Sequence, residues 1–258
     1  MIFVDTHTHL YLEDFDADRD QVIADAMAVG VDYFLFPNVD ATTTEAMLAL
    51  CSKYPLHCYP MMGLHPTSVD QDYEEPLLQT KKLIETGKYI AIGEIGMDLY
   101  WDKTFVEEQK YVLAEQLHLA VALHLPVVIH SRNSFDEIMV VIQQTALPGL
   151  TGVFHCFSGT VEQAGQVIAL GFKIGIGGVL TFKNSGLDKV VQHFGLEHLL
   201  LETDSPYLAP VPYRGKRNQS AYIPLIARKI ADIKNVPLQQ VAEITTQNAK
   251  ELFKLGSY

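Results

Sequence analysis

Hydrophobic and polar positions follow two alternating patterns along this 258-residue chain. Eight short apolar segments have the composition of buried β-strands. They run from Phe3 to Thr6, Tyr33 to Phe36, Cys58 to Met62, Ile90 to Ile92, Val127 to Ile129, Thr151 to Phe154, Phe172 to Ile176 and Leu199 to Leu201. Segments between them repeat apolar residues at helical spacing, as in Glu107 to His124 and Ser134 to Thr145. The sequence therefore predicts that strand and helix alternate through the whole chain.

Short buried strands separated by helices are typical of βαβ units and a parallel sheet. Eight such units in about 250 residues fit a closed (β/α)8 TIM barrel better than an open sheet. No low-complexity tract or glycine-serine linker interrupts the pattern, so residues 1–258 are expected to form one barrel domain. Two further amphipathic segments, Pro224 to about Asn235 and Leu238 to about Leu255, are expected to form extra C-terminal helices that cover the outside of the barrel.

Composition and charge narrow the class of protein. With 48% hydrophobic and 19% charged residues the chain is typical of a globular protein with a sizeable core. The net charge of −12 argues against a protein that coats nucleic acid by charge alone, although an acidic enzyme with a metal-filled cleft remains compatible with it. Neither a secretory signal nor an apolar run of about 20 residues is found, so we expect a cytoplasmic protein without a membrane partner. No feature indicates an obligate protein partner.

The three cysteines, Cys51, Cys58 and Cys156, form neither an even framework nor a C-x-x-C pair, which favours free thiols. Cys156 follows His155 directly and is a possible nucleophile. Adjacent strand residues face opposite ways, however, so Cys156 is expected to point away from a site that His155 faces.

The carboxyl ends of the predicted strands carry polar side chains of the kinds that bind metals, and barrel enzymes build their active sites at this end. The residues are His7, His9, His65, Glu94, Asp98, His130, His155, Glu202 and Asp204. His7 and His9 are two residues apart on a strand and should therefore point to the same side. Because histidine is not a common turn former, five histidines at strand ends indicate a metal site.

Two divalent ions need about six to eight protein donors, and one carboxylate is usually shared between them. Six candidate ligands can be divided in this way: His7, His9 and Asp204 for one ion, His130 and His155 for the other, and Glu94 as the bridge.

The ordered motifs DTHTHL, GLHP, GEIGMD, IHSR, HCFSG and LLETDSPYLAP, followed by RGKRN, resemble the motif series of TatD-family deoxyribonucleases. This family is a branch of the amidohydrolase-like metal-dependent hydrolases, and the match runs from Val4 to Asn218. The resemblance implies a distorted TIM barrel with one or two divalent ions (Mg²⁺, Mn²⁺ or Zn²⁺). It also implies hydrolysis of phosphodiester bonds in DNA, often by removal of nucleotides from the 3′ end, with single strands or frayed ends as substrate. The metal ligands implied by the motifs are His7, His9, Glu94, His130, His155 and Asp204.

Three residues at the strand ends are candidates for catalytic roles. Asp204 is the candidate general base, because a ligand carboxylate can also accept a proton from the attacking water. Glu202, two residues earlier on the same face, either orients ligands or is a buried structural acid. His65 either stabilises the phosphate and protonates the leaving oxygen, or is a structural histidine in a turn that ends in proline.

Four basic residues are candidates for phosphate or DNA contacts. Arg132, just past His130, suits a bidentate phosphate clamp, with a helix-capping or salt-bridging arginine as the alternative. Arg214, Lys216 and Arg217 form a compact basic cluster after the eighth strand, where many barrels bind phosphate. A solvated charged loop is the alternative for this cluster.

Two sequence features depart from the expected family pattern. Leu99 follows the aspartate of GEIGMD where an aromatic residue is common, and Tyr100 and Trp101 come after it as possible base-stacking residues. The seventh predicted strand is also unusually rich in glycine.

Two other functions remain open at this stage. One is a superfamily hydrolase acting on a small phosphoester, lactone or amide. Many such relatives bridge their metals with a carbamylated lysine, and no lysine lies at the predicted strand ends, which favours the TatD branch. The other is a non-catalytic metal-binding scaffold, which would be favoured if a ligand or the candidate base were missing. Histidine and carboxylate ligands suit zinc, manganese or iron, whereas magnesium prefers more oxygen donors, so the native ion stays open.

Overall fold

The computed structural model describes residues 1–100 and 102–256, and within them strands and helices alternate as predicted. The strands are β1 (Phe3–Asp5), β2 (Val31–Phe36), β3 (Cys58–Pro60), β4 (Ile92–Asp98), β5 (Val127–Arg132), β6 (Gly152–Phe154), β7 (Lys173–Ile176) and β8 (Leu199–Leu201). The α-helices are α1 (Arg19–Ala28), α2 (Thr44–Lys53), α3 (Glu74–Thr86), α4 (Val106–Ala122), α5 (Phe135–Thr145), α6 (Val161–Ala169), α7 (Leu187–His193), α8 (Ile223–Lys234) and α9 (Leu238–Phe253).

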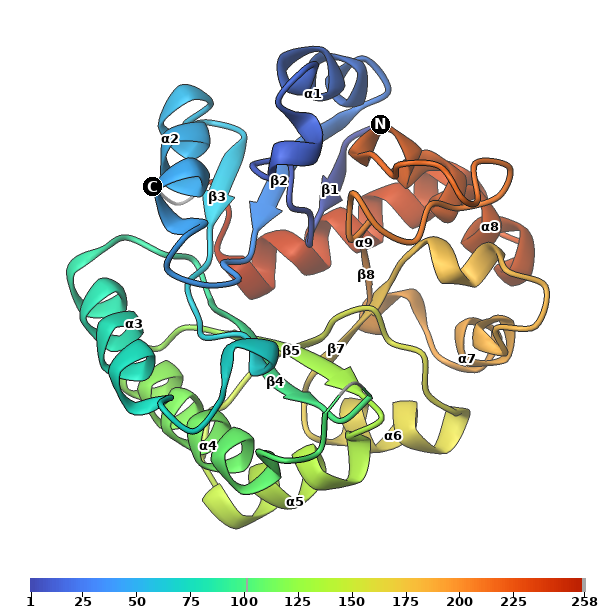
Figure 1. Ribbon diagram of the computed structural model, residues 1–258. Helices are drawn as coiled ribbons and strands as arrows, with labels where there is room; N and C mark the ends of the chain where they lie inside the picture. Colours follow the sequence, from blue (N-terminus) through green and yellow to red (C-terminus); the bar gives the residue numbers. More distant parts are fainter. Residues whose placement is uncertain (101, 257–258) are drawn as a thin grey trace.

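The strands form two parallel sheets, β1-β2-β3 and β4-β5-β6-β7-β8, whose edges meet at two seams. At the first seam the backbone N–H of Ile90 donates to the carbonyl of Pro60 at 3.1 Å. At the second, Thr6 donates to Leu201 at 3.0 Å. The result is a distorted (β/α)8 barrel, with the strands at the centre and most helices in a ring around them (Figure 1). The predicted fold class is confirmed.

The fourth strand differs most from its prediction. The apolar run suggested Ile90 to Ile92, whereas β4 begins at Ile92 and continues to Asp98. Pairing with β5 explains the difference, because Ile95 to Asp98 lie opposite Ile129 to Arg132. These tertiary hydrogen bonds override the weak strand propensity of the glycines and carboxylates in this segment. Glu94 consequently lies within a strand and not after one.

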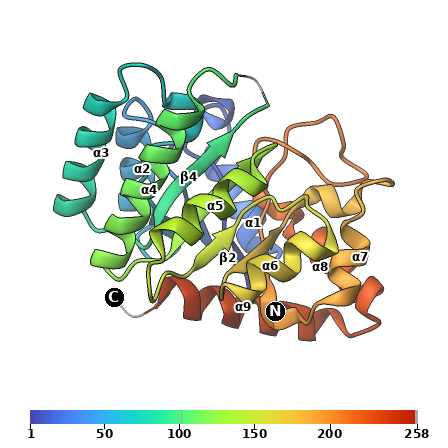
Figure 2. The same cartoon turned by 90° about the horizontal axis from the view of Figure 1, so that it is seen from below.

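The last helix is also placed differently from the prediction. The helix α8 belongs to the outer ring, but α9 lies across the amino-terminal end of the barrel (Figure 2). Apolar residues that the strands place inside the barrel at this end pack in one cluster with the end of α9. The cluster includes Val4, Leu35, Val128, Val153, Leu200, Phe253 and Leu255. Since α9 covers this end, the carboxyl end is the open one.

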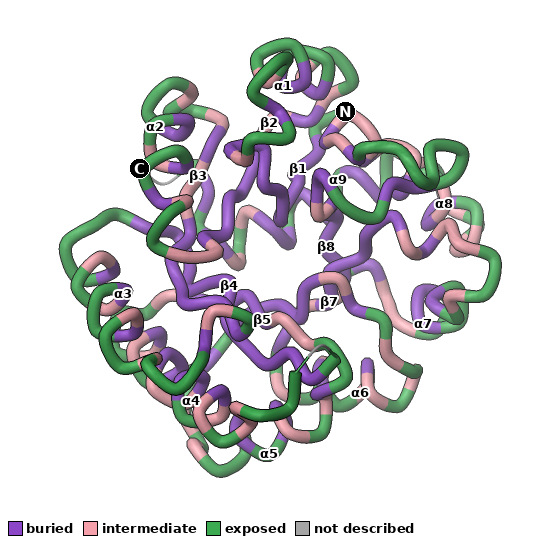
Figure 3. The backbone as a smooth tube through the Cα atoms, viewed as in Figure 1, coloured by how far each residue is buried: buried purple, intermediate pink, exposed green. Residues whose placement is uncertain are grey.

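Burial follows the same division, with buried strands at the centre and exposed outer faces on the helices (Figure 3). Among the described residues, no helix combines the length and apolar character needed to cross a membrane.

Candidate metal centre

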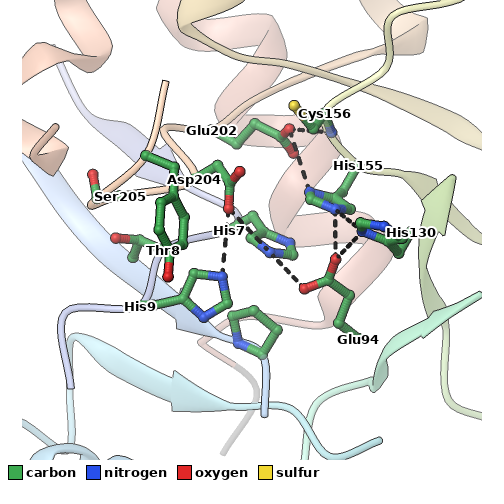
Figure 4. A network of polar contacts seen from close by, with 12 residues as sticks. His7, Thr8, His9, Glu94, His130, His155, Cys156, Glu202, Asp204 and Ser205 are labelled. Atoms are coloured by element: carbon green, nitrogen blue, oxygen red, sulfur yellow. Dashed lines mark hydrogen bonds and ion pairs between the residues drawn. The ribbon is translucent and has the colours of Figure 1, made fainter. Parts of the chain in front are cut away.

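The predicted ligands converge at the open, carboxyl end of the barrel (Figure 4). His7 and His9 follow β1, Glu94 lies in β4, His130 lies in β5, His155 follows β6 and Asp204 follows β8. All of these residues except His130 and Asp204 are buried, and those two are partly buried. Segments nearly 200 residues apart are thus brought into one cluster.

The carboxylate of Glu94 lies at the centre of this cluster. Its Oε1 lies 2.6 Å from Nε2 of His155, 2.8 Å from Nδ1 of His130 and 3.4 Å from Nε2 of His65. Its Oε2 points the other way, 3.2 Å from Nε2 of His7. The two oxygens therefore face different sets of histidines, as a carboxylate shared by two ions would.

Asp204 lies on the opposite side of the β1 histidines. Its Oδ1 is 3.4 Å from Nε2 of His9 and 3.8 Å from Nε2 of His7. Its backbone adopts a left-handed conformation with φ of 57°, and its N–H donates to the carbonyl of His7 at 2.8 Å. This hydrogen bond ties the end of β8 to the end of β1 and holds the carboxylate near both rings.

His130 lies between two carboxylates of β4. Its Nδ1 faces Glu94, while its Nε2 lies 3.1 Å from Oδ2 of Asp98. Glu94 and Asp98 are four residues apart in a strand, so they share a face. Asp98, which was predicted to lie at a strand end without a specific role, therefore orients the His130 ring. The i, i+4 spacing in GEIGMD is the signal that could have identified it.

His65 has a hydrogen-bond pattern that determines which ring nitrogen carries the proton. Its Nδ1 accepts the backbone N–H of Thr67 at 3.2 Å, at the start of a short 3-10 helix (Pro66–Ser68). In the neutral ring the proton is therefore on Nε2, which faces Glu94. His65 is thus arranged as a hydrogen-bond donor toward the site, and its catalytic role stays a prediction.

The electrostatics of the cluster favour a positive charge at its centre. Burial opposes ionisation of Glu94, but His155, His65 and His7 together hold its pKa well below the usual range. Burial would lower the pKa of His155, yet the neighbouring Glu94 carboxylate raises it to about 9. Burial lowers the pKa of His7 to about 4, so this ring is neutral and can donate a lone pair.

The donor set fits a divalent cation. Among the described residues, the buried atoms without a hydrogen-bond partner include both ring nitrogens of His7 and Nδ1 of His155. Unpaired buried nitrogens are costly unless something else binds them. Within the part of the chain that the structure describes, three groups of side chains each place potential ligand atoms within 4.8 Å of one another: His7 with His155 and Asp204, His7 with His9 and Glu94, and His65 with Glu94 and His130. Nitrogen and carboxylate donors of this kind suit zinc, manganese and similar ions.

Glu202 supports the loop that carries His155. Its Oε1 accepts the backbone N–H of Cys156 and lies 3.8 Å from Nδ1 of His155. Burial raises the pKa of Glu202 to about 8. The glycines of the seventh strand explain how this side chain fits, because a Cβ on Gly175 would lie 2.2 Å from Oε2 of Glu202. The unexpected glycine content of β7 thus makes room for a buried carboxyl group.

Substitution of Gly175 by Ala is expected to destabilise the fold and displace Glu202. Overpacking of a dense core costs about 1–3 kcal/mol. Thermal and urea unfolding of the chelator-treated protein measure the change. Gly165→Ala in α6 is the matched control, since its Cβ would lie 3.6 Å from the Phe194 ring, the nearest group beyond the backbone of its own helix. Removal of a helical glycine should stabilise by about 0.5–1 kcal/mol. Equal stability of the two variants would contradict the packing argument.

The expectation that Cys156 points away from the site rests on strand alternation, which does not apply here. Cys156 lies beyond the end of β6 with φ of 44°, and the residue contributes to the lining of the site cavity. Burial, with nearby carboxylates, raises the pKa of its thiol well above the usual range. The protonated thiol is a poor nucleophile, which argues against a catalytic cysteine.

Two cavities open at the centre. The larger, about 590 Å³, is lined by the predicted ligands His9, Glu94, His130, His155 and Asp204 together with apolar residues that include Leu12, Val39, Val179, Tyr207 and Leu208. The smaller, about 370 Å³, shares Ser131, His155 and Ser158 with it. The shared lining makes one extended depression with the ligand cluster on its floor.

Of the predicted phosphate contacts, all of which the structure describes, Arg132 is the one that lies at the site cavity. Arg132 lines the larger cavity, with its guanidinium carbon 4.0 Å from the ring centroid of Tyr100. Tyr100 is 51% exposed, and Trp101, the other proposed stacking residue, lies outside the described residues.

The basic cluster after β8 lies outside the lining of both cavities. Arg217 donates two hydrogen bonds to Asp18, at 2.6 Å and 3.0 Å, and one to the carbonyl of Asp14. Arg214 stacks over Phe182 at 4.4 Å, and Lys216 is exposed. Contact of this cluster with phosphate therefore stays a prediction.

Two further residues hold the ends of the strands together. The carboxylate of Asp5 accepts both the N–H and the hydroxyl of Thr203, at 2.9 Å and 2.6 Å, and the N–H of His7 at 3.4 Å. The buried side chain of Asn218 donates to the carbonyls of Thr203 and Tyr207. These bonds fix the loop that presents Asp204, and explain structurally why the motif series extends to Asn218.

A barrel that gathers histidines and carboxylates at the carboxyl ends of its strands is the architecture of a metal-dependent hydrolase. The family described as "TatD related DNase" matches residues 4–254, and this chain belongs to that family.

Several relatives agree with this assignment. The chain is 36% identical to the uncharacterized metal-dependent hydrolase YabD of Bacillus subtilis over 257 residues, covering 99% of this chain and 100% of the relative. It is 31% identical to a protein named 3′-5′ ssDNA/RNA exonuclease TatD from Erwinia billingiae, over 97% of this chain and 98% of that relative. The crystal structure of the TatD homologue YjjV from Escherichia coli superposes with a TM-score of 0.91 at 32% identity, covering 98% of each chain. The chain is therefore an enzyme, a metal-dependent hydrolase.

Proposed function

We propose that this protein, acting as one barrel domain over residues 1–258, hydrolyses phosphodiester bonds at the 3′ ends of single-stranded or frayed DNA. The observation that carries the proposal is the position of Glu94, whose two oxygens face different histidines beside a cavity that Asp204 also lines. One or two divalent ions would be held by the six predicted ligands: His7, His9, Glu94, His130, His155 and Asp204. Bound ions would lower the pKa of a water molecule and supply positive charge beside the phosphate.

The side chains of this chain would divide the remaining work. Asp204 would accept the proton of the attacking water. Burial alone would raise its pKa, but the neighbouring histidines hold the pKa below the usual range, so the carboxylate is ionised and free to accept a proton. His65 presents its Nε2–H toward the phosphate or the leaving oxygen. Arg132 at the cavity wall suits a nonbridging phosphate oxygen. Glu202 holds the Cys156 backbone and thereby His155, a positioning role.

The shape of the site supports a nucleic-acid strand more than a compact ester. The larger cavity has apolar walls suited to a base, and the adjoining cavity, which shares Ser131, His155 and Ser158 with it, leaves further room for a strand. The relative named as a 3′-5′ ssDNA/RNA exonuclease supports cleavage from the 3′ end. Its name also makes single-stranded RNA a second substrate to test. A small phosphoester is the alternative substrate, favoured by the net charge of −12.

The test is cleavage of end-labelled single- and double-stranded DNA, and of matched RNA, by chelator-stripped protein reloaded separately with Mg²⁺, Mn²⁺ or Zn²⁺. We expect a metal-dependent ladder that shortens from the 3′ end and is faster on single strands. Folded, metal-loaded protein that cleaves no strand but hydrolyses bis(4-nitrophenyl) phosphate would instead support the small-phosphoester alternative.

Tyr207→Ala is expected to raise KM for single-stranded DNA while leaving hydrolysis of bis(4-nitrophenyl) phosphate nearly unchanged. The ring is 53% exposed and lines the larger cavity, so it is available to stack on a base. Such stacking contributes about 1–3 kcal/mol, which corresponds to about 5- to 150-fold in KM. Tyr213→Ala is the matched control, because Tyr213 stacks on Tyr222 in the same segment and does not line the cavity. Equal effects on both substrates would contradict a base-stacking role.

A further inference from the structure

Tyr11 is a buried phenol beside the metal centre that the proposed chemistry does not use. It is 2% exposed and lies two residues after His9. Its hydroxyl oxygen is 2.5 Å from the carbonyl oxygen of Pro37 and 2.9 Å from Nδ1 of His9. Its ring packs edge-on against His9 and Phe36. The phenol therefore connects the ligand strand β1 to the end of β2.

The chemistry of these three groups fixes the direction of both hydrogen bonds. A carbonyl oxygen only accepts, so two oxygens at this separation require the phenol proton between them, and Tyr11 donates to Pro37. A hydroxyl has one proton, so the phenol oxygen can only accept from His9. Nδ1 of His9 must then carry a proton.

We propose that Tyr11 is a positioning residue that holds neutral His9 in the Nδ1–H tautomer, so that the Nε2 lone pair is directed at a divalent ion. This inference rests on the metal site of the proposed function, and concerns metal binding only. Nε2 of His9 faces Oδ1 of Asp204 at 3.4 Å. In the neutral Nδ1–H tautomer the Nε2 lone pair faces the carboxylate, and the two repel unless a proton or a metal cation lies between them. The tautomer therefore arranges this pair to bind a cation.

His65 provides a contrast within the same site. The Thr67 N–H occupies its Nδ1, so His65 holds the opposite tautomer, with the proton on Nε2. His9 and His65 face the same cluster but hold different tautomers, because Tyr11 contacts Nδ1 of His9 and Thr67 contacts Nδ1 of His65. His9 offers a lone pair to a metal, whereas His65 offers a proton to an oxygen.

The direct test is long-range ¹H–¹⁵N correlation NMR of ¹⁵N-histidine-labelled, metal-free protein at a pH where His9 is neutral, with assignment by His9→Gln and His65→Gln spectra. We expect the Nδ1–H pattern for His9 and the Nε2–H pattern for His65. The opposite pattern or a mixed one for His9 would overturn the proposal. This measurement uses the unmodified Tyr11, so it does not depend on a Tyr11 variant being folded.

The second test is Zn²⁺ affinity of Tyr11→Phe, measured by calorimetry with the metal alone. The variant keeps the aromatic ring but loses the hydroxyl oxygen that accepts from Nδ1 of His9. Loss of a residue that hydrogen-bonds to a metal ligand lowers metal affinity about 10- to 100-fold. Tyr33→Phe is the matched control, because Tyr33 packs against Tyr59 and lies near Lys250 of α9, away from the site. Unchanged affinity and an unchanged His9 tautomer in folded Tyr11→Phe would overturn the proposal. Because no nucleic acid is present, failure of the nuclease hypothesis leaves both results interpretable.

Discussion

Glu94→Gln is expected to abolish loading of two ions and nearly all activity. The glutamine has the same size but lacks the charge, and its amide nitrogen cannot act as a ligand. The carboxylate contacts His7 through one oxygen and His65, His130 and His155 through the other, so the substitution affects both halves of the site. Mutation of a residue that only hydrogen-bonds to a metal ligand lowers metal affinity or activity by up to about 100-fold. Because Glu94 is itself a predicted ligand, its loss should lower activity by more than this.

Metal stoichiometry by mass spectrometry of the dialysed protein, together with calorimetric titration, measures this effect. Glu251→Gln is the matched control, since this residue is exposed on α9 at the opposite end of the barrel. The control should bind metal like the unmodified protein. Two ions bound per chain in Glu94→Gln would rule out the bridging role, whatever the activity.

The order of strands and the place of the site could be predicted because both depend on local pattern. Eight apolar runs, separated by helical segments, leave few parallel arrangements, and the carboxyl ends of barrel strands are where ligands meet. The limits of β4 could not be predicted in this way, because they depend on pairing with β5 and not on the residues of β4 alone. The place of α9 was missed for a related reason. An amphipathic face indicates that a helix packs against apolar residues but not which ones.

The role of single side chains depends on partners far away in the sequence. His130 is oriented by Asp98, 32 residues earlier, and Arg217 is paired with Asp18, 199 residues earlier. A count of charges in RGKRN cannot reveal the Asp18 partner. The tautomers of His9 and His65 likewise depend on which atom contacts each Nδ1. Residue types and spacing thus identify a cluster of ligands, whereas the tasks within it require coordinates.

Asp204→Asn is expected to lower kcat about 100- to 10,000-fold, the range for loss of a general base, while the protein keeps much of its metal. The asparagine oxygen can still lie near His9 and His7, but the amide cannot accept a proton from water. The backbone hydrogen bond to His7 does not involve the side chain, so the loop should keep its position. Single-turnover cleavage of end-labelled DNA and parallel metal titration separate the two effects.

Asp188→Asn on the exposed face of α7 makes the same change of charge away from the site and should cleave at the unmodified rate. If Asp204→Asn loses its metal and its activity together, and high metal concentration restores full activity, Asp204 is a ligand and not the base. A defect in kcat that persists at saturating metal would support proton transfer to Asp204. The left-handed turn at this residue would then serve catalysis, since it places an ionised carboxylate beside the histidines of β1.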